Sequence, residues 1–321
     1  MRHNTPPSAS THDARVVYFI ASHREPSQVV RLVRRIRAQR PSSLILIHHD
    51  YSKSDLSREL FADDPNVEFV DKWVTGEWGG FSLVQLALNG IDQLFERGRD
   101  FEWVTFMSGQ DYPSRSLFEF EQSLESVGDG AIDYSDIRAT SLDRYRVAYF
   151  RLPRQFESRF AHRVFYVLHL ISRFQPLLRF TTGRIGCRIG VRMSSRVSAG
   201  GLAVRKGNQW WTLSRRSLEY VRTFVRQRPD VVTWFRERTL LPDEAFFQTI
   251  LCDAPFSLTG NDGHYAKWSD EDAFSPDILS SADVPGIVES KKYFARKFDI
   301  GVDANVLDLL DERTIGVVEH S

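Results

Sequence analysis

The sequence predicts an α/β protein whose central sheet is mostly parallel and is flanked by helices. Short, continuous apolar runs, typical of strands buried on both faces, alternate with segments in which apolar residues recur at helical spacing. Strands that alternate with helices form βαβ units, which build parallel sheets. With 321 residues, 42% of them hydrophobic and 12% aromatic, the chain can form a large core.

The first half of the chain supplies four predicted strands and two predicted helices. A strand at residues 15–21 precedes a helical pattern that includes Val29, Leu32 and Ile36 and ends at Pro41. The next elements, in order, are strands at 44–47 and 67–70, a helix at 81–94 and a strand at 101–107.

Three of these strands run into polar residues. The polar ends are His23 and Arg24, His48 to Asp50, and Ser108 to Asp111. Ligands of parallel α/β sheets bind beyond the carboxyl ends of the strands, so we expect the functional site at this edge. The first strand is not followed by GxGxxG, and GxxxxGK[ST] is absent from the sequence. A dinucleotide-dependent dehydrogenase and a P-loop enzyme are therefore disfavoured.

The segment at about 144–206 differs in composition from the rest. Twelve arginines lie between Arg144 and Lys206, against the single acid Glu157. We expect a basic helical insertion in a single domain that spans residues 15–321. Its apolar run at 164–171 is too short to span a bilayer. Two interpretations remain: an amphipathic helix that contacts a membrane surface or covers the site, and a helix packed on the domain with solvated arginines.

A pair of adjacent acids, Asp243 and Glu244, follows Pro242 at the start of a predicted helix. A strand at 207–214 and a helix at 216–226 precede it, and a closing helix is expected at 304–310. Negative charge is favoured in the first turn of a helix, which suits a general base there. The alternative is that the two acids only cap the helix.

Charge and cysteine content narrow the class of protein. The formal net charge is zero, so the chain as a whole does not attract nucleic acid or membrane, and we expect no nucleic-acid partner. Cys187 and Cys252 are far apart and lack metal-site spacing, which fits a reducing compartment. Residues 1–14 are polar, and we interpret them as a disordered lead-in to a cytoplasmic protein.

Seven short motifs, spread over most of the chain, resemble a known family. They are Ala21-Ser22-His23, Ile47-His48-His49-Asp50, Trp78-Gly79-Gly80-Phe81-Ser82, Ser108-Gly109-Gln110-Asp111-Tyr112-Pro113, Asn208-Gln209-Trp210-Trp211, Pro242-Asp243-Glu244, and Phe294-Ala295-Arg296-Lys297-Phe298-Asp299. Together they resemble the core-2/I-branching N-acetylglucosaminyltransferase and peptide O-xylosyltransferase family (glycosyltransferase family 14). The resemblance implies a nucleotide-sugar transferase fold of the GT-A type and inverting transfer from a UDP-sugar to a hydroxyl.

The resemblance also implies roles for the acids and cations. Inverting transfer needs a base for the acceptor hydroxyl and positive charge on the departing diphosphate. Glu244 occupies the position of the base, with Asp243 as its structural neighbour, and Lys297 matches the family's late lysine, with Arg296 beside it. A second cation remains open among Lys292, His264 and Lys267.

Many GT-A enzymes hold a metal on an Asp-X-Asp motif after a central strand. Here the corresponding place offers only Asp111, and the sequence Asp270-Glu271-Asp272 comes too late in the chain. We therefore expect catalysis without a metal or other cofactor.

Donor and acceptor residues are suggested by the strand ends and the tryptophans. Asp50 and His23 are candidates for hydrogen bonds to the uridine, or else cap the elements that follow them. Trp268 and Trp78 are candidate platforms for the acceptor sugar, as are Trp210 and Trp211. Asp111 either holds an acceptor hydroxyl or stabilises its own turn.

The function expected from these residues is inverting, metal-independent transfer of a β-linked sugar, first of all N-acetylglucosamine, from a UDP-sugar to a hydroxyl of a glycan or glycolipid. Transfer from UDP-xylose is the alternative donor hypothesis. A third hypothesis is an inactive binding protein on the same fold, whose insertion contacts a membrane or polyanion. We also predict a cytoplasmic location. Peripheral contact with a membrane through residues 144–206 remains an open alternative.

Overall fold

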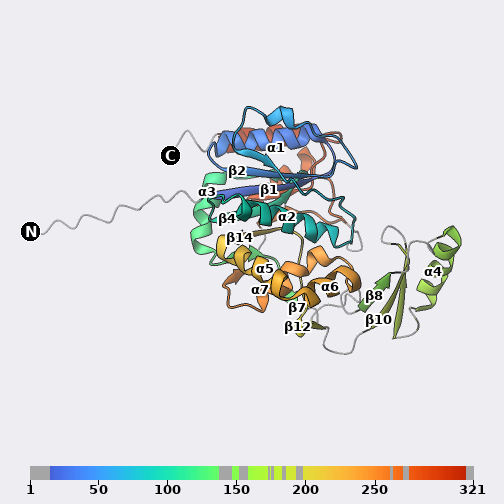
Figure 1. Cartoon of the computed structure of the whole chain (residues 1–321). Helices are drawn as coiled ribbons and strands as arrows, with labels where there is room; N and C mark the ends of the chain where they lie inside the picture. The colour runs from blue at the N-terminus through green and yellow to red at the C-terminus, as the bar shows by residue number, and fades with distance from the viewer. Residues whose placement is uncertain are drawn as a thin grey trace, which may run out of the picture.

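The computed structural model describes residues 15–136, 147–151, 158–172, 174, 177–182, 186–192, 198–260, 263–269 and 275–315. The predicted lead-in at 1–14 lies outside these residues. A central sheet with helices on both sides forms the body, and a smaller lobe built from the insertion stands at its side (Figure 1).

The central sheet has seven strands in the order β15-β6-β14-β4-β1-β2-β3. Their bounds are β1 Val16–Ser22, β2 Leu44–His49, β3 Val67–Phe69, β4 Trp103–Ser108, β6 Gly130–Ile132, β14 Trp211–Ser214 and β15 Leu258–Thr259. All ladders are parallel except those that β14 forms with β4 and with β6. The predicted α/β class with a mostly parallel sheet flanked by helices is confirmed.

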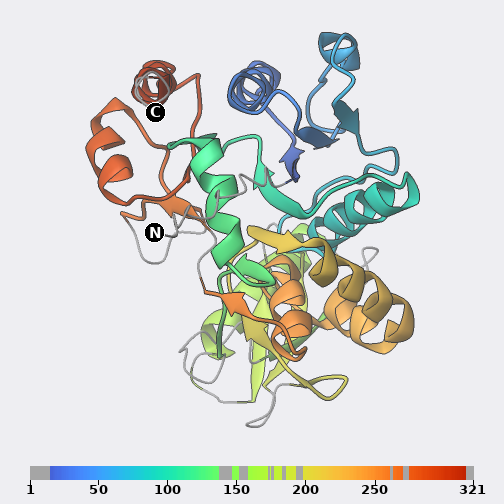
Figure 2. The same ribbon diagram turned by 90° about the vertical axis from the view of Figure 1, so that its left-hand side faces the viewer.

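Helices cover both faces of this sheet (Figure 2). One face carries α1 Pro26–Gln39, α3 Leu117–Ser123, α8 Val284–Glu289 and α9 Asn305–Ile315; the other carries α2 Ser82–Glu96, α5 Arg215–Gln227, α6 Pro229–Arg238 and α7 Phe246–Cys252. Alternate residues of β1 enter the two cores, with Val17 and Phe19 on the α2 side and Tyr18 and Ile20 on the α1 side. Burial on both faces explains why this strand is apolar throughout.

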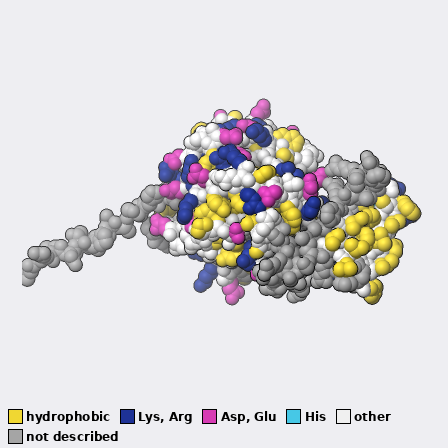
Figure 3. All heavy atoms as spheres, turned by 60° about the horizontal axis from the view of Figure 1, so that its bottom comes forward, with side chains coloured by type: hydrophobic (Ala, Val, Ile, Leu, Met, Phe, Trp, Pro, Cys, Tyr) yellow, Lys and Arg dark blue, Asp and Glu magenta, His cyan; other side chains and the backbone are white. Residues whose placement is uncertain are grey.

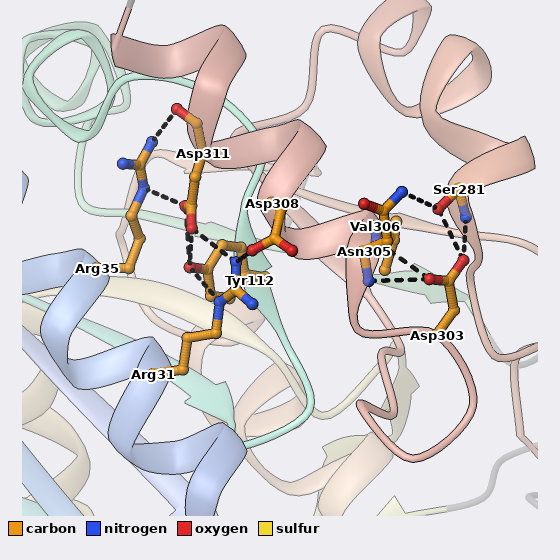
Figure 4. A network of polar contacts seen from close by, with 9 residues as sticks. All are labelled: Arg31, Arg35, Tyr112, Ser281, Asp303, Asn305, Val306, Asp308 and Asp311. Atoms are coloured by element: carbon orange, nitrogen blue, oxygen red, sulfur yellow. Dashed lines mark hydrogen bonds and ion pairs between the residues drawn. The ribbon is translucent and has the colours of Figure 1, made fainter.

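Ion pairs attach the last helix to the first (Figure 4). Asp311 of α9 lies 2.9 Å from Arg31 Nη2 and 3.0 Å from Arg35 Nε, and the Tyr112 hydroxyl donates a hydrogen bond to it at 2.9 Å. Asp303 accepts the N–H of Asn305 at the start of α9. The C-terminal segment is thereby held against the α1 face of the sheet.

A small sheet connects that segment to the end of β4. It consists of β5 Tyr112–Pro113, β17 Phe294–Arg296 and β16 His264–Ala266, with β17 in the middle. The remaining short elements are η1 Arg58–Phe61, η2 Leu124–Ser126, β7 Ser135–Asp136, β11 Ser198–Ala199, β12 Leu202–Ala203, β13 Arg205–Lys206, η6 Pro242–Glu244 and η7 Ser281–Asp283.

The insertion is only partly helical, which corrects the prediction of a basic helical insertion. Its helix α4 Arg159–Ser172 packs on an antiparallel sheet of β8 Val147–Arg151, β10 Arg188–Arg192 and β9 Leu178–Thr181. The strands form because β9 and β10 alternate polar and apolar side chains with a period of two. None of the helices in the part of the chain that the structure describes has the length and apolar character needed to cross a membrane.

Candidate active site

A cavity of about 290 Å³ lies at the carboxyl end of β4. Trp210 directly precedes β14, whose residue Trp211 pairs with Phe106 of β4, so Trp210 lies next to the end of that strand. Side chains from four distant parts of the sequence meet in its walls, among them Asp133, Asn208, Trp210, His264, Trp268, Lys292 and Arg296. The expectation of a site at this sheet edge agrees with the position of the cavity.

Asp111 stabilises the loop that follows β4. Its side chain is fully buried, and its Oδ2 accepts the backbone N–H of Ser108 at 2.7 Å. Arg296 Nε lies 3.2 Å from Oδ1, and His264 Nε2 lies 3.4 Å from Oδ2. Burial alone would raise the pKa of Asp111, but Arg296 and His264 outweigh it and lower that pKa. Asp111 therefore does not face an acceptor, which corrects one of its two predicted roles.

Arg296 is oriented by the residues on either side of its guanidinium. Besides Asp111, it lies over the ring of Trp210, with Cζ 4.3 Å from the ring centroid. Planar guanidinium groups stack well on aromatic faces and present their N–H groups in a defined direction. Its position in the wall of the cavity makes Arg296 a cation preorganised for an anionic ligand. The peptide bond from Arg296 to Lys297 is cis.

Lys297 lies among other positive charges. Burial, and then the charges of Arg296 and Arg24, lower the pKa of Lys297. Its ammonium group donates a hydrogen bond to the hydroxyl of Ser275, and Arg24 forms an ion pair with Asp299. Clustered cations of this kind attract a diphosphate, whose charge relieves their mutual repulsion.

The three candidates for a second cation differ in their surroundings. Lys267 forms an ion pair with Asp283, and His264 is buried against Asp111. Lys292 lines the cavity together with Arg296, as His264 does, but Lys292 is the more exposed of the two. Its position makes Lys292 the best candidate of the three.

The two predicted uridine ligands lie in different environments. His23 lies just beyond β1 with much of its surface open to solvent; partial desolvation of the ring, and then the nearby charge of Lys53, lower its pKa. Asp50 is 2% exposed, and it accepts hydrogen bonds from Ser52 and from the Gly76 N–H at 2.9 Å. Burial opposes ionisation of Asp50, yet these hydrogen bonds lower its pKa. The Asp50 side chain thus links the end of β2 to the loop before Trp78. These contacts favour the structural, capping role of Asp50 over hydrogen bonding to the uridine.

Glu244 lies in a separate 3₁₀ turn, Pro242–Glu244, and not in the first turn of α7 as we expected. Ala245, with φ of −140°, separates the turn from the helix, so Glu244 lies outside the first helical turn, where the helix dipole favours negative charge. Leu241 has φ of 53°, a left-handed conformation that is uncommon for leucine, and its side chain is buried in the core. Core packing therefore holds a strained backbone next to the two acids.

The two acids differ in exposure. Asp243 is buried, and its Oδ1 has no hydrogen-bond partner, whereas Glu244 is partly exposed. Burial, and then the charge of Glu244, raise the pKa of Asp243 to about 8. Burial thus favours the protonated form of Asp243.

The Pro242–Glu244 turn, called the acidic turn below, lies close to residues that line two cavities. The carbonyl of Glu244 accepts the N–H of Gly207 at 2.7 Å, and the next residue, Asn208, lines the cavity described above, although Glu244 is not part of its lining. On the other side, Thr239 lines a second cavity of about 480 Å³ with Gly79, Gly80 and Arg188. The acids thus lie on the segment between two concave surfaces.

The two tryptophans proposed as platforms for the acceptor sugar lie near different cavities. Trp268 is 52% exposed and lines the first cavity, whereas Trp78 is 38% exposed and directly precedes Gly79 of the second. Trp211 is fully buried in the core, which excludes it as a platform. Trp210 is also buried, beneath Arg296.

Sequence reasoning missed Asp133 as a lining residue. It follows β6, a strand of three residues that is too short to give a clear pattern. Among the described residues, no group of three or more His, Cys, Asp or Glu side chains is arranged to hold a metal ion. Asp270 and Asp272 lie outside those residues.

Fold and site together define an α/β protein in which a cavity lined by Arg296 and Lys292 lies at the end of the central sheet, with the acids Asp243 and Glu244 in a nearby turn. The profile of the family described as "Branch: Core-2/I-Branching enzyme" matches residues 16–288, and the chain belongs to this family. The resemblance inferred from the seven motifs is therefore confirmed.

Two relatives illustrate the similarity to curated proteins. Xylosyltransferase 2 of Rattus norvegicus is 26% identical over 94% of this chain and 34% of its own length. A mouse beta-1,3-galactosyl-O-glycosyl-glycoprotein beta-1,6-N-acetylglucosaminyltransferase 4 is 22% identical over 95% of this chain and 67% of its own. The chain thus spans about a third of the length of the first of these relatives. The solved structure of the WbbM bifunctional glycosyltransferase covers 91% of this chain and 46% of its own, at 12% identity and a TM-score of 0.38, too low to support a functional argument.

The buried proton of Asp243 makes stability depend on pH. Between the ordinary pKa of 3.8 and about 8, the unfolded chain releases this proton while the native chain retains it. The free energy of unfolding should therefore fall as the pH rises through this range, by about 1.4 kcal/mol for each unit of the pKa difference at most. Asp243→Asn should remove this part of the slope, as measured by urea unfolding at several pH values. Asp253→Asn, at an exposed acid, is the control, and an unchanged slope in Asp243→Asn would contradict the buried-proton assignment.

Proposed function

We propose that the protein is an inverting glycosyltransferase that moves N-acetylglucosamine from UDP-N-acetylglucosamine, with β linkage, to a hydroxyl of a glycan or glycolipid acceptor. The observation that carries the proposal is the fixed guanidinium of Arg296, held between Asp111 and Trp210 in the wall of the first cavity. Membership of the Core-2/I-Branching enzyme family supports the same class of reaction.

In this mechanism the leaving group is the diphosphate of UDP. Arg296 and Lys297 bind its oxygens and neutralise the charge that develops as the bond between sugar and phosphate breaks. Lys292, in the same cavity wall, supplies further positive charge. Asp111 acts as a positioning residue, because it touches Arg296 and has no surface available to a substrate.

Glu244 removes the proton of the acceptor hydroxyl as this oxygen attacks the sugar. Its partial exposure allows contact with a substrate, and burial, which favours the protonated form of Asp243, makes Glu244 the better placed of the two to carry negative charge. Trp268 provides an exposed aromatic face on which the acceptor sugar packs. In this proposal the cations perform the task that a metal ion performs in many related folds, so no metal is required.

A second donor hypothesis, UDP-xylose, is supported by the similarity to xylosyltransferase 2, which is 26% identical to this chain. It uses the same base and the same cations and differs only in the contacts to the sugar. An inactive binding protein on this fold is the third hypothesis. The predicted cytoplasmic location remains a prediction.

Glu244→Gln should reduce transfer by at least roughly 100-fold, because a general base contributes about 10²- to 10⁴-fold. Affinity for UDP should remain close to that of the native protein, since the amide preserves the shape of the side chain. Single-turnover transfer and calorimetric titration with UDP measure the two effects separately. Glu219→Gln, at an exposed position of α5, is the matched control, and retained turnover in Glu244→Gln would exclude the proposed base.

Lys297→Ala should weaken UDP binding by roughly 10- to 100-fold, the loss expected when a hydrogen bond to a charged group is removed. Because burial, and then the charges of Arg296 and Arg24, lower the pKa of Lys297, UDP binding should also weaken at a lower pH than for an ordinary lysine. Titration calorimetry across alkaline pH provides both measurements. Lys72→Ala, at an exposed lysine, should bind UDP like the native protein; an unaltered affinity in Lys297→Ala would refute the diphosphate role.

A panel of nucleotide sugars, assayed with and without a chelator, tests donor and metal together. We expect turnover of UDP-N-acetylglucosamine that persists in the chelator. Preference for UDP-xylose would select the second hypothesis, and absence of turnover with every donor, together with UDP binding, would select the third. Activity that disappears with chelator and returns with manganese would contradict the metal-free mechanism.

A further inference from the structure

Exposed apolar side chains are concentrated on the lobe formed by the insertion. Figure 3 shows hydrophobic side chains gathered over this lobe, at one end of the molecule. The large hydrophobic residues exposed there include Phe160, Tyr166, Val167, Leu170, Ile171 and Phe174. Isolated exposed apolar residues need no explanation, but a contiguous apolar patch marks a surface that contacts something else.

The patch follows one side of α4. Phe160, Val164, Val167 and Ile171 are spaced by three or four residues, so they form a single stripe along the helix, and they are 75%, 38%, 52% and 56% exposed. On the opposite side, Phe165 is buried against Phe180 of β9, with ring centroids 5.8 Å apart. The helix therefore uses one apolar side for its own lobe and presents a second one outward.

The charged residues of α4 itself are all positive. Arg159 and Arg163 are exposed on α4, which contains no acidic residue. In the sequence from 144 to 206, Glu157 is the only acid among the many arginines. An exposed helix that combines apolar, aromatic and arginine side chains is complementary to a surface with an apolar interior and anionic groups at its boundary.

We propose that α4 docks on the surface of an anionic phospholipid membrane, with its apolar stripe in the interface and its arginines at the headgroups. With 14 residues, the helix is shorter than the ~20 that cross a bilayer, so it lies in the plane of the interface. A second copy of the chain fits this face less well, because pairing two α4 helices would bury arginines with no acid on either helix to pair with them.

Docking through α4 also orients the proposed transferase. Arg188 of β10, in the same lobe, forms part of the wall of the 480 Å³ cavity, next to Gly79, Gly80 and Thr239. The lobe thus carries α4, the proposed membrane-binding helix, and also contributes Arg188 to a cavity close to the Pro242–Glu244 turn. This step rests on the proposed function and points to an acceptor carried by a lipid, whereas membrane docking itself stands on the lobe alone.

Sedimentation of the full chain with vesicles tests the docking directly and requires no turnover. One set of vesicles contains phosphatidylcholine alone, and the other contains equal parts of phosphatidylcholine and phosphatidylglycerol. We expect binding to the anionic set that weakens with salt. Val164→Asp combined with Val167→Asp should reduce it by roughly 100-fold or more, and Arg159→Gln combined with Arg163→Gln by roughly 30-fold.

The control changes two apolar residues of similar exposure on the body of the molecule. Leu60 and Val302 are 58% and 64% exposed, and Leu60→Asp combined with Val302→Asp should bind vesicles like the native chain. Unchanged UDP affinity in all three variants shows that the body remains folded. Binding that survives both α4 variants, or failure of the native chain to bind anionic vesicles, overturns the proposal. A dimer in light scattering that Val164→Asp with Val167→Asp dissociates, without vesicle binding, would assign the face to a second copy instead.

Discussion

The ion pair between Asp111 and Arg296 is the interaction on which the candidate site depends. A carboxylate without exposed surface is unfavourable unless it is paired and hydrogen-bonded, and Arg296, His264 and the Ser108 N–H together meet this need. Asp111 follows β4 of the central sheet, whereas Arg296 ends β17 near the end of the chain. One buried charge pair therefore joins the parallel sheet to the C-terminal segment and orients a cation over Trp210 at the same time.

Most of the central sheet was predictable because its signal is local. Strands β1, β2, β3 and β4 are short apolar runs with polar ends, and each lies within two residues of its predicted position. Their order in space follows from βαβ connections, so the edge that carries the site was predictable too. The antiparallel strand β14 and the short strand β6 break this regularity, and the second of these was missed.

The arrangement of the site was less predictable, because its contacts join residues that are far apart in sequence. The motifs identified Asp111, Arg296 and Trp210 separately, but only the fold shows that Asp111 binds the guanidinium and is not available to a substrate. Likewise, proline followed by two acids reads as the start of a helix, while Ala245 breaks the chain into a 3₁₀ turn and a helix. In the insertion, the long apolar run at 164–171 concealed the alternating pattern of β9 and β10.

The conformation of Leu241 links the interior of the molecule to its chemistry. This residue holds a left-handed backbone because its side chain is anchored among buried apolar neighbours, and the acidic turn begins one residue later. The direction in which Glu244 points is thus partly determined by how well that apolar anchor fits. A substitution in the core beneath Leu241 would therefore shift the turn that carries Asp243 and Glu244 as well as lower the stability of the fold.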